Sequence, residues 1–134
     1  EMLRQNSRPY LFSNSLAPSI AGASLATLDL LKSSGDLLTK LRENTEYFRS
    51  EMTRRGFEIP ESDHPIVPVM VGDAVKAAKM ADAMLAKGIY VRAFSYPVVP
   101  KGKARIRTQM SAGLTREQRD KAIKAFEEAR AEIG

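Results

Sequence analysis

The 134-residue sequence contains no cysteine and only one histidine, His64. Without cysteine there can be no disulfide, thiolate metal site or thiol nucleophile, and one histidine leaves little for imidazole chemistry. The chain also lacks an apolar run of the roughly 18 residues that cross a bilayer, and its first residues lack the basic start and apolar stretch of a signal peptide. We therefore expect a soluble domain with no metal site and no membrane segment.

The chain has a formal net charge of +5 at pH 7. Clustered lysines and arginines gain affinity for nucleic acids by releasing counterions from the phosphates. Here, however, basic and acidic residues alternate along helical segments, as in Lys40, Arg42, Glu43 and Glu46. Such alternation is typical of a solvated helix face, and no basic run with interleaved aromatic residues occurs. The sequence therefore argues against a nucleic-acid partner.

The order of elements along the chain predicts an α+β, sandwich-like domain preceded by two helices. The small apolar residues of 16–33 predict a tightly packed helix, and apolar residues at three- and four-residue steps predict a second helix between Asp36 and Gly56. Strands are expected at 57–59, 66–72, 89–96 and 104–111, and helices at 73–87 and after Thr115. The β-α-β-β-α order of the compact part predicts an antiparallel sheet with its helices on one face.

The stretch ARIRTQMS, residues 104–111, alternates cleanly between apolar and polar side chains. Alternation predicts a half-buried strand whose outer face carries Arg105, Arg107 and Gln109. One interpretation is a solvated polar face, which is common for sheets with one buried side. The other is a carboxylate site, because a guanidinium donates two parallel hydrogen bonds to a carboxylate and a strand holds the arginine rigidly. The residues alone leave both open.

The stretch RPYLFSNSLAPS, residues 8–19, places Ser13, Asn14 and Ser15 just before a helix that begins near Pro18. One of the three side chains can cap that helix. Alternatively, the three can complete an anion site at the helix N-terminus, where free amides concentrate positive charge.

Two further predictions concern packing and the single histidine. The apolar residues Val75, Ala78, Ala81 and Leu85 are predicted to share one face of the helix at 73–87, and Met80 and Met84 are interpreted as packing residues. His64 lies in the loop PESDHP beside acidic residues. We interpret it as an ordinary surface residue.

Four stretches together resemble the C-terminal part of the α-oxoamine synthases, a family of pyridoxal-phosphate enzymes. They are RPYLFSNSLAPS, HPIVPVMVGDA, GIYVRAFSYPVVPKGKARIRTQMSAG and the helix start LTREQ, which together run essentially the length of the chain. The wider family shares a looser YP-x-VP-x-G followed by an R-x-R strand. The combination of YPVVPKG with ARIRTQMSA is similar to the members that join glycine to acetyl-CoA.

The resemblance implies a fold-type I enzyme with pyridoxal 5'-phosphate as cofactor. Residues 36–134 would form its small C-terminal domain, and residues 1–35 an interface arm and the start of the interdomain helix. The implied enzyme is a homodimer with active sites at the subunit interface. It condenses glycine with acetyl-CoA to 2-amino-3-ketobutyrate and CoA, a reaction of threonine catabolism, in the cytoplasm of a bacterium or the mitochondrion of a eukaryote.

The resemblance also implies roles for individual residues. Arg107, the second arginine of RIR, corresponds to the family residue that holds the carboxylate of the amino-acid substrate. Ser13 corresponds to the hydroxyl residue that reaches the cofactor phosphate of the neighbouring subunit, with Phe12 and Asn14 beside it. Fixing the carboxylate orients the Cα–H bond that must break, so Arg107 is expected to orient the substrate and not to act as acid or base.

Two departures from the family pattern limit what this chain can do. Leu114 stands where the family usually has histidine. The family's Schiff-base lysine lies upstream of the RPY stretch, as do the residue that stacks on the cofactor ring and the acid that pairs with its nitrogen. No lysine of this chain, including Lys32 and Lys40, lies in a comparable context. We therefore expect no catalytic residue in this fragment and no turnover by it alone.

Two alternatives stay open. The first is a sister synthase that uses another amino acid or acyl thioester, such as those that make 8-amino-7-oxononanoate or 5-aminolevulinate. The second is a free-standing, non-enzymatic module with a ferredoxin-like sheet that binds a small molecule. The module predicts that residues 1–35 pack on their own sheet, whereas the enzyme fragment predicts exposed apolar surface that a missing large domain covers.

Overall fold

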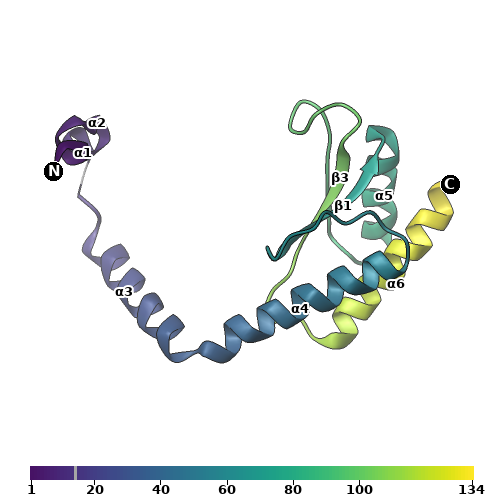
Figure 1. Cartoon of the computed structure of the whole chain (residues 1–134), viewed down its shortest axis with the longest axis horizontal. Helices are drawn as coiled ribbons and strands as arrows, with labels where there is room; N and C mark the ends of the chain where they lie inside the picture. Colours follow the sequence, from purple (N-terminus) through teal and green to yellow (C-terminus); the bar gives the residue numbers. More distant parts are fainter. Residues whose placement is uncertain (14) are drawn as a thin grey trace. The chain divides into compact units, whose positions relative to one another are not determined.

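The computed structural model describes residues 1–13 and 15–134, with only the backbone of residues 11 and 12. The chain forms two compact units, Glu1–Gly35 and Asp36–Gly134, which can be followed by colour in Figure 1. Asn14 lies outside the described residues, and so does the side chain of Phe12. The roles expected for these two residues at the cofactor phosphate therefore stay predictions.

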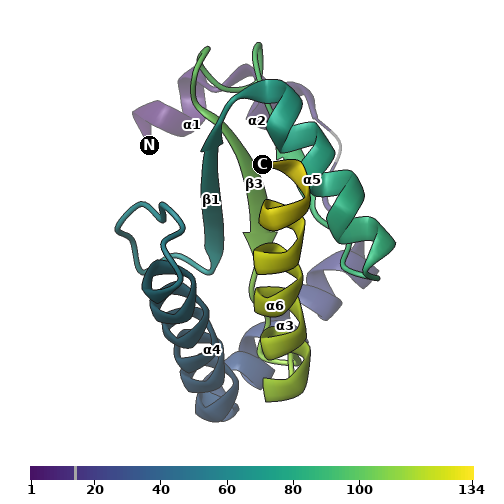
Figure 2. The same ribbon diagram turned by 90° about the vertical axis from the view of Figure 1, so that its right-hand side faces the viewer.

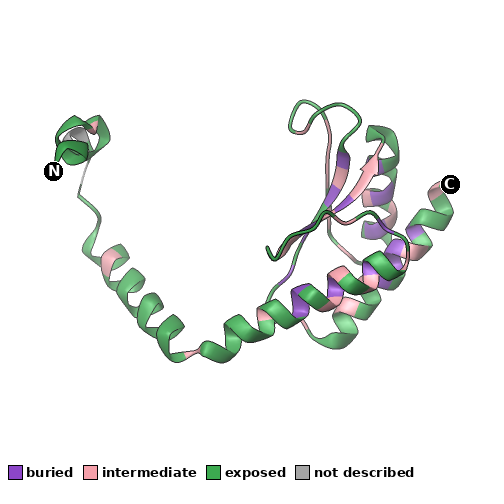
Figure 3. Cartoon of the chain, viewed as in Figure 1, coloured by how far each residue is buried: buried purple, intermediate pink, exposed green. Residues whose placement is uncertain are grey.

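The first unit is helical and leaves its apolar side chains exposed. It contains α1 (Met2–Asn6), α2 (Arg8–Phe12) and α3 (Pro18–Ser33), and no residue of α3 is buried. Leu25, Leu28 and Leu31 are 64%, 53% and 59% exposed, and the whole helix is almost uniformly green in Figure 3. The helix predicted at 16–33 is confirmed, but its predicted tight packing is not found within the described residues of this unit.

The second unit is a two-layer α+β domain, as predicted. Its strands β1 (Ile66–Gly72), β2 (Arg92–Phe94) and β3 (Ala104–Gln109) form an antiparallel sheet in the order β1-β3-β2. The helices α4 (Gly35–Arg54), α5 (Ala74–Ala86) and α6 (Arg116–Ile133) lie on one face of that sheet, as Figure 2 shows. The edge position of β1 explains how Pro68, which has no N–H, can lie in a strand.

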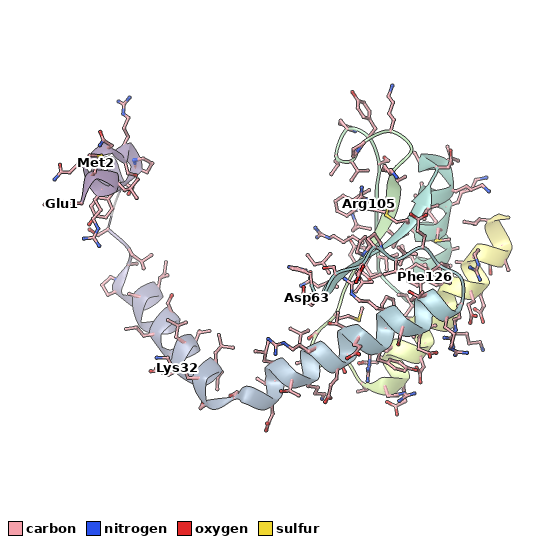
Figure 4. All side chains as sticks on the ribbon, viewed as in Figure 1. Glu1, Met2, Lys32, Asp63, Arg105 and Phe126 are labelled. Carbon is pink, nitrogen blue, oxygen red and sulfur yellow. The ribbon has the colours of Figure 1, made fainter. Side chains whose placement is uncertain are left out.

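The core lies between the sheet and the helices. The alternation of 104–111 is confirmed, because Ala104, Ile106 and Thr108 are buried while Arg107 and Gln109 are exposed. Phe126 of α6, labelled in Figure 4, is fully buried and packs edge-to-face against Phe48 and Phe57 with centroid distances of 6.4 and 5.8 Å. Such aromatic pairs add to the stability gained from burial alone. The core thus fixes the position of β3.

The strand predicted at 89–96 is much shorter than expected. The N–H of Ile89 donates to the carbonyl of Met84, and so ends α5. At the other end, the carbonyl of Ser95 accepts hydrogen bonds from Val98 and Val99 in a turn. Because these backbone groups serve the helix end and the turn, only Arg92–Phe94 remain to pair with β3. The strand predicted at 57–59 is likewise reduced to one bridge between Glu58 and Met70.

The apolar stripe predicted along one face of α5 is not the face that packs inward. Val75 and Leu85 are 62% and 58% exposed, whereas Ala77, Met80 and Met84 are the buried residues. Alanines occur all around this helix, so an apolar stripe at three- and four-residue steps fits more than one face. The packing role of the two methionines is confirmed.

The predicted starts of the helices at 73–87 and after Thr115 are confirmed, and a side chain caps each of them. The Asp73 side chain accepts from the N–H of Lys76 at 2.8 Å, and Thr115 and Gln118 form a reciprocal capping box. Gly56, with φ of 76°, follows the end of α4. Its positive φ lets the N–H of Phe57 reach the carbonyl of Met52, which turns the chain toward β1.

Candidate functional site

The helix-free face of the sheet carries a group of arginines. Strand β3 directs Arg105, Arg107 and Gln109 away from the buried side, and Arg105 is labelled in Figure 4. The register places Arg107 between Pro68 of β1 and Arg92 of β2. The predicted outer face is therefore confirmed, and it gains a further arginine from the neighbouring strand.

Arg92 and Arg107 are direct cross-strand partners. Side chains at such positions begin roughly 4.5–5.5 Å apart, and like charges placed there repel each other. Both side chains are exposed, and neither forms an ion pair with a carboxylate in the part of the chain that the structure describes. Two facing guanidiniums without a carboxylate partner are chemically suited to bind an anion.

The Arg107 side chain is supported by an aromatic ring. Its Cζ atom lies 4.9 Å from the centroid of Phe94 on β2. A guanidinium stacked on a ring is attracted by the electrons of the ring face while its N–H groups remain free at its edge. Arg107 can therefore donate two parallel hydrogen bonds to a carboxylate or phosphate.

A cleft of about 560 Å³ includes both arginines in its lining. It lies between residues 88–92, the stretch 107–110 of β3 and its continuation, and α6, with Phe48 and Phe126 at its apolar base. Its cations are Arg92, Arg107, Arg119 and Lys121, and no aspartate or glutamate lines it among the described residues. We call this the cationic cleft. Its charge selects anionic ligands.

Tyr47 of α4 positions the arginines at the start of α6. The Cζ atoms of Arg116 and Arg119 lie 4.2 and 4.9 Å from its ring centroid. Its hydroxyl donates to Asp120, and this hydrogen bond raises the pKa of Tyr47 above its usual range. The phenol therefore stays protonated and anchored, which fixes the ring below the two guanidiniums.

The segment around Ser13 does not cap α3 in the way that one interpretation predicted. The N-cap of α3 is Ala17, and no side chain caps this end among the described residues. The N–H of Ser13 donates to the carbonyl of Pro9 at 2.9 Å, and Ser13 itself is exposed. Its hydroxyl makes no hydrogen bond with another described residue. It is therefore accessible to a ligand.

His64 is an exposed loop residue, as predicted. Its Nδ1 accepts from the N–H of Ile66 at 3.0 Å, and its carbonyl accepts from Arg49. Both contacts order the loop that precedes β1. Over residues 1–13 and 15–134, no group of histidines and carboxylates is arranged to hold a metal ion, and no helix is long and apolar enough to cross a membrane.

Sequence reasoning missed Arg92, Arg119 and Lys121 as site residues. Their positions depend on the β2–β3 register and on how α6 packs, neither of which local periodicity reveals. Leu114, at the position where the resemblance implies a histidine, is half-buried against the core and lines the cationic cleft. Its carbonyl accepts from Asn44 Nδ2 at 3.2 Å. The side chain at this position is therefore apolar packing and not a proton donor.

Residues 1–126 match the family model for class I and II aminotransferases. The chain is 52% identical over all of its 134 residues to 2-amino-3-ketobutyrate coenzyme A ligase of Escherichia coli K12 and covers 34% of that protein. It is 54% identical over 127 residues to the mitochondrial enzyme of the same name in Mus musculus, covering 95% of this chain and 30% of that protein. Identity to 8-amino-7-oxononanoate synthase of Symbiobacterium thermophilum is 40% over 134 residues, again with 34% of that protein covered.

Among solved structures, serine palmitoyltransferases have the same fold. A high-resolution structure of this enzyme with PLP superposes with a TM-score of 0.90 at 29% identity, covering 98% of this chain and 34% of that one. The Sphingomonas wittichii enzyme superposes with a TM-score of 0.89 at 27% identity, covering 99% of this chain and 34% of that one. The present chain thus spans about a third of the length of the proteins that it matches.

Proposed function

The chain belongs to the class I and II aminotransferase family, and we propose that it is the C-terminal part of a pyridoxal-phosphate-dependent glycine C-acetyltransferase. This acyltransferase joins glycine to acetyl-CoA and releases 2-amino-3-ketobutyrate and CoA. The observation that carries the proposal is the 52% identity to 2-amino-3-ketobutyrate coenzyme A ligase over the whole chain, against 40% to 8-amino-7-oxononanoate synthase. The family match over residues 1–126 also disfavours a free-standing module.

Arg107 binds the carboxylate of glycine in this proposal. Its guanidinium lies on a strand whose other face is packed in the core, is supported by Phe94 and has no carboxylate partner within the described residues. Two parallel hydrogen bonds then hold the substrate in one orientation, which lowers the entropic part of the barrier to reaction. Arg107 orients the substrate and transfers no proton.

The residues of this chain fit the phosphate of pyridoxal 5'-phosphate through Ser13. Its exposed hydroxyl makes no hydrogen bond to another described residue, and the nearby end of α3 lacks a side-chain cap. When bound, the cofactor supplies an electron sink for the negative charge that develops on the glycine Cα. Asn14 and Phe12 are proposed beside Ser13, from the neighbouring subunit of a homodimer.

The exposed leucines of α3 support the proposal of a longer, dimeric enzyme. A helix whose apolar side chains are more than half exposed marks an interaction surface. We propose that residues 1–35 are the interface arm, that residues 36–134 are the small domain, and that the Schiff-base lysine is supplied by the rest of the enzyme. The location proposed is the bacterial cytoplasm, or the mitochondrion in a eukaryote.

An assay of the full-length enzyme tests the function. Glycine with acetyl-CoA should release free CoA, which a chromogenic thiol reagent measures continuously. Alanine and longer acyl thioesters, the substrates expected of sister synthases, should give at least about tenfold lower kcat/KM, a difference of about 1.4 kcal/mol in transition-state binding. A preference for alanine with a long-chain thioester would assign the enzyme to the sister activity instead.

A further inference from the structure

We propose that the cationic cleft binds the phosphate groups of the acyl-CoA substrate, with Arg92, Arg119 and Lys121 as the phosphate-binding residues. The identity of the thioester rests on the proposed function. The assignment of the cleft to a polyanion rests on the cleft itself.

The cations of α6 differ in whether they have a carboxylate partner. Arg116 and Lys124 have carboxylate partners, Asp120 at 3.6 Å and Glu128 at 3.7 Å. Arg119 and Lys121 have none within the described residues, and these two are the α6 cations that line the cleft. The remaining cation of α6, Arg130, lies outside the cleft and donates to the carbonyls of Arg55 and Gly56. The α6 cations outside the cleft therefore have acceptors within the protein, whereas Arg119 and Lys121 have no carboxylate partner among the described residues.

The cations of the cleft that lack a carboxylate partner come from separate elements. Lys121 reaches from α6 toward the chain entering β2, because its Nζ lies 3.6 Å from the position that a Cβ on Gly88 would occupy. Arg119 is held by a hydrogen bond from its Nε to the carbonyl of Thr115 at 3.2 Å and by Tyr47. The Arg119 side chain is therefore positioned before any ligand arrives, which favours tight binding. Arg92 approaches from β2.

The remaining lining of the cleft is largely apolar and aromatic. The volume of about 560 Å³ is within the usual range for a small-molecule site. Phe48, Met110 and Phe126 form an apolar base, and Tyr90, 72% exposed, lies on the lining. A ligand that combines a flat base with phosphates uses both the apolar surface and the cations. The nucleotide half of CoA has this composition, whereas glycine offers one carboxylate, for which Arg107 suffices.

Variants of the full-length enzyme test the assignment. Arg119→Ala combined with Lys121→Ala should weaken CoA binding at least about tenfold by titration calorimetry, since each phosphate contact is a charge-assisted hydrogen bond. Arg92→Ala should also weaken CoA binding. The KM for acetyl-CoA should rise in parallel, while the KM for glycine changes less than about twofold. Lys124→Ala is the matched control, because it removes the same charge from the same helix outside the cleft.

Acetyl-pantetheine, which carries the thioester but no phosphate, separates phosphate recognition from general damage. Wild type and the double variant should use it equally well. If the double variant binds CoA as tightly as wild type does, the cleft is covered by another part of the enzyme and the inference is overturned, while the proposed function stands. If CoA binding depends on these residues but glycine is not condensed, the cleft assignment stands and the proposed function fails.

Discussion

Arg92 and Arg107 face each other as direct partners across the β2–β3 ladder, on the side of the sheet opposite the helices of its own unit. Like charges in this relationship reduce the stability of a sheet unless an anion lies between them. Neither has a carboxylate partner among the described residues, so the neutralising group is expected to be a ligand.

Arg107→Ala in the full-length enzyme should sharply weaken the use of glycine. Loss of a bidentate contact to the carboxylate is expected to lower kcat/KM for glycine by about 100-fold, since charge-assisted hydrogen bonds contribute about 1.5–3 kcal/mol each. The absorbance of the bound cofactor should stay nearly unchanged, because the arginine is proposed to touch the substrate. Arg107→Lys keeps the charge but not the planar fork, and should recover only part of the activity. A variant that lost the cofactor instead would contradict the orienting role.

Arg92→Thr should make the ligand-free protein more stable. Removing one of two facing like charges is expected to raise the free energy of unfolding by about 0.2–1 kcal/mol, and threonine suits a strand. Urea unfolding at low and high salt measures this effect. Because salt screens repulsion between exposed charges, the gain should shrink as ionic strength rises. A loss of stability at low salt would show that the two guanidiniums do not repel each other.

At saturating CoA, the wild-type enzyme should become more stable than Arg92→Thr. A ligand that binds the folded state raises stability in proportion to its affinity, so CoA should stabilise the wild-type enzyme more than Arg92→Thr. The melting temperatures of both proteins, measured with and without CoA, give the comparison. Equal shifts in the two proteins would remove Arg92 from the phosphate site.

The sequence predicted the sheet and most helix ends because those features depend on local chemistry. Alternation fixes which side of β3 is buried, and Asp73 or Thr115 can cap only the helix that follows. The inward face of α5 and the length of β2 were not predictable in this way. The first depends on which of several apolar stripes meets the sheet, and the second on backbone groups such as Ser95 that a turn also uses.

In the candidate site, too, the residues set by local sequence were predictable, and those set by tertiary packing were not. Arg107 was predicted as a site residue from the alternation of its strand and from the family resemblance. Both signals lie within a single element of the sequence. Arg92, Arg119 and Lys121 come from a neighbouring strand and a helix, and only the tertiary arrangement brings them to one cleft. No single segment of the sequence distinguishes Lys121, which lacks a carboxylate partner within the described residues, from Lys124, which has one.

Ser13→Ala should weaken cofactor binding in the full-length enzyme. The loss of one hydroxyl contact to a phosphate is expected to raise the Kd of pyridoxal 5'-phosphate about tenfold, equivalent to about 1.4 kcal/mol. Excess cofactor should then restore kcat. Ser24→Ala, which removes an exposed hydroxyl of α3 that donates to the carbonyl of Ile20, serves as control and should bind the cofactor as wild type does. If both variants bind the cofactor normally, the proposed phosphate role of Ser13 is wrong.

Arg49→Ala should destabilise the second unit by about 2–3 kcal/mol, because several hydrogen bonds from a charged donor are lost at once. Its guanidinium donates to the carbonyls of Pro60, His64 and Ile66, and so attaches the loop before β1 to α4. Partial burial lowers the pKa of Arg49, yet the group remains charged at neutral pH. Arg42→Ala, at an exposed position of the same helix, should change stability by less than about 0.5 kcal/mol. Chemical unfolding of the two variants decides the point.

The acid limb of the stability profile should depend on Glu51. Hydrogen bonds from Arg54 and then Arg55 lower the pKa of this carboxyl to about 2. A carboxyl whose pKa is lower in the folded than in the unfolded state stabilises the protein above the unfolded value of about 4.3, and this contribution disappears as the pH falls toward 2. Wild type should therefore exceed Glu51→Gln in melting temperature at pH 6, and the difference should narrow steadily below about pH 4.5. A difference that stays constant down to pH 3 would mean that Glu51 acts through packing and not through its charge.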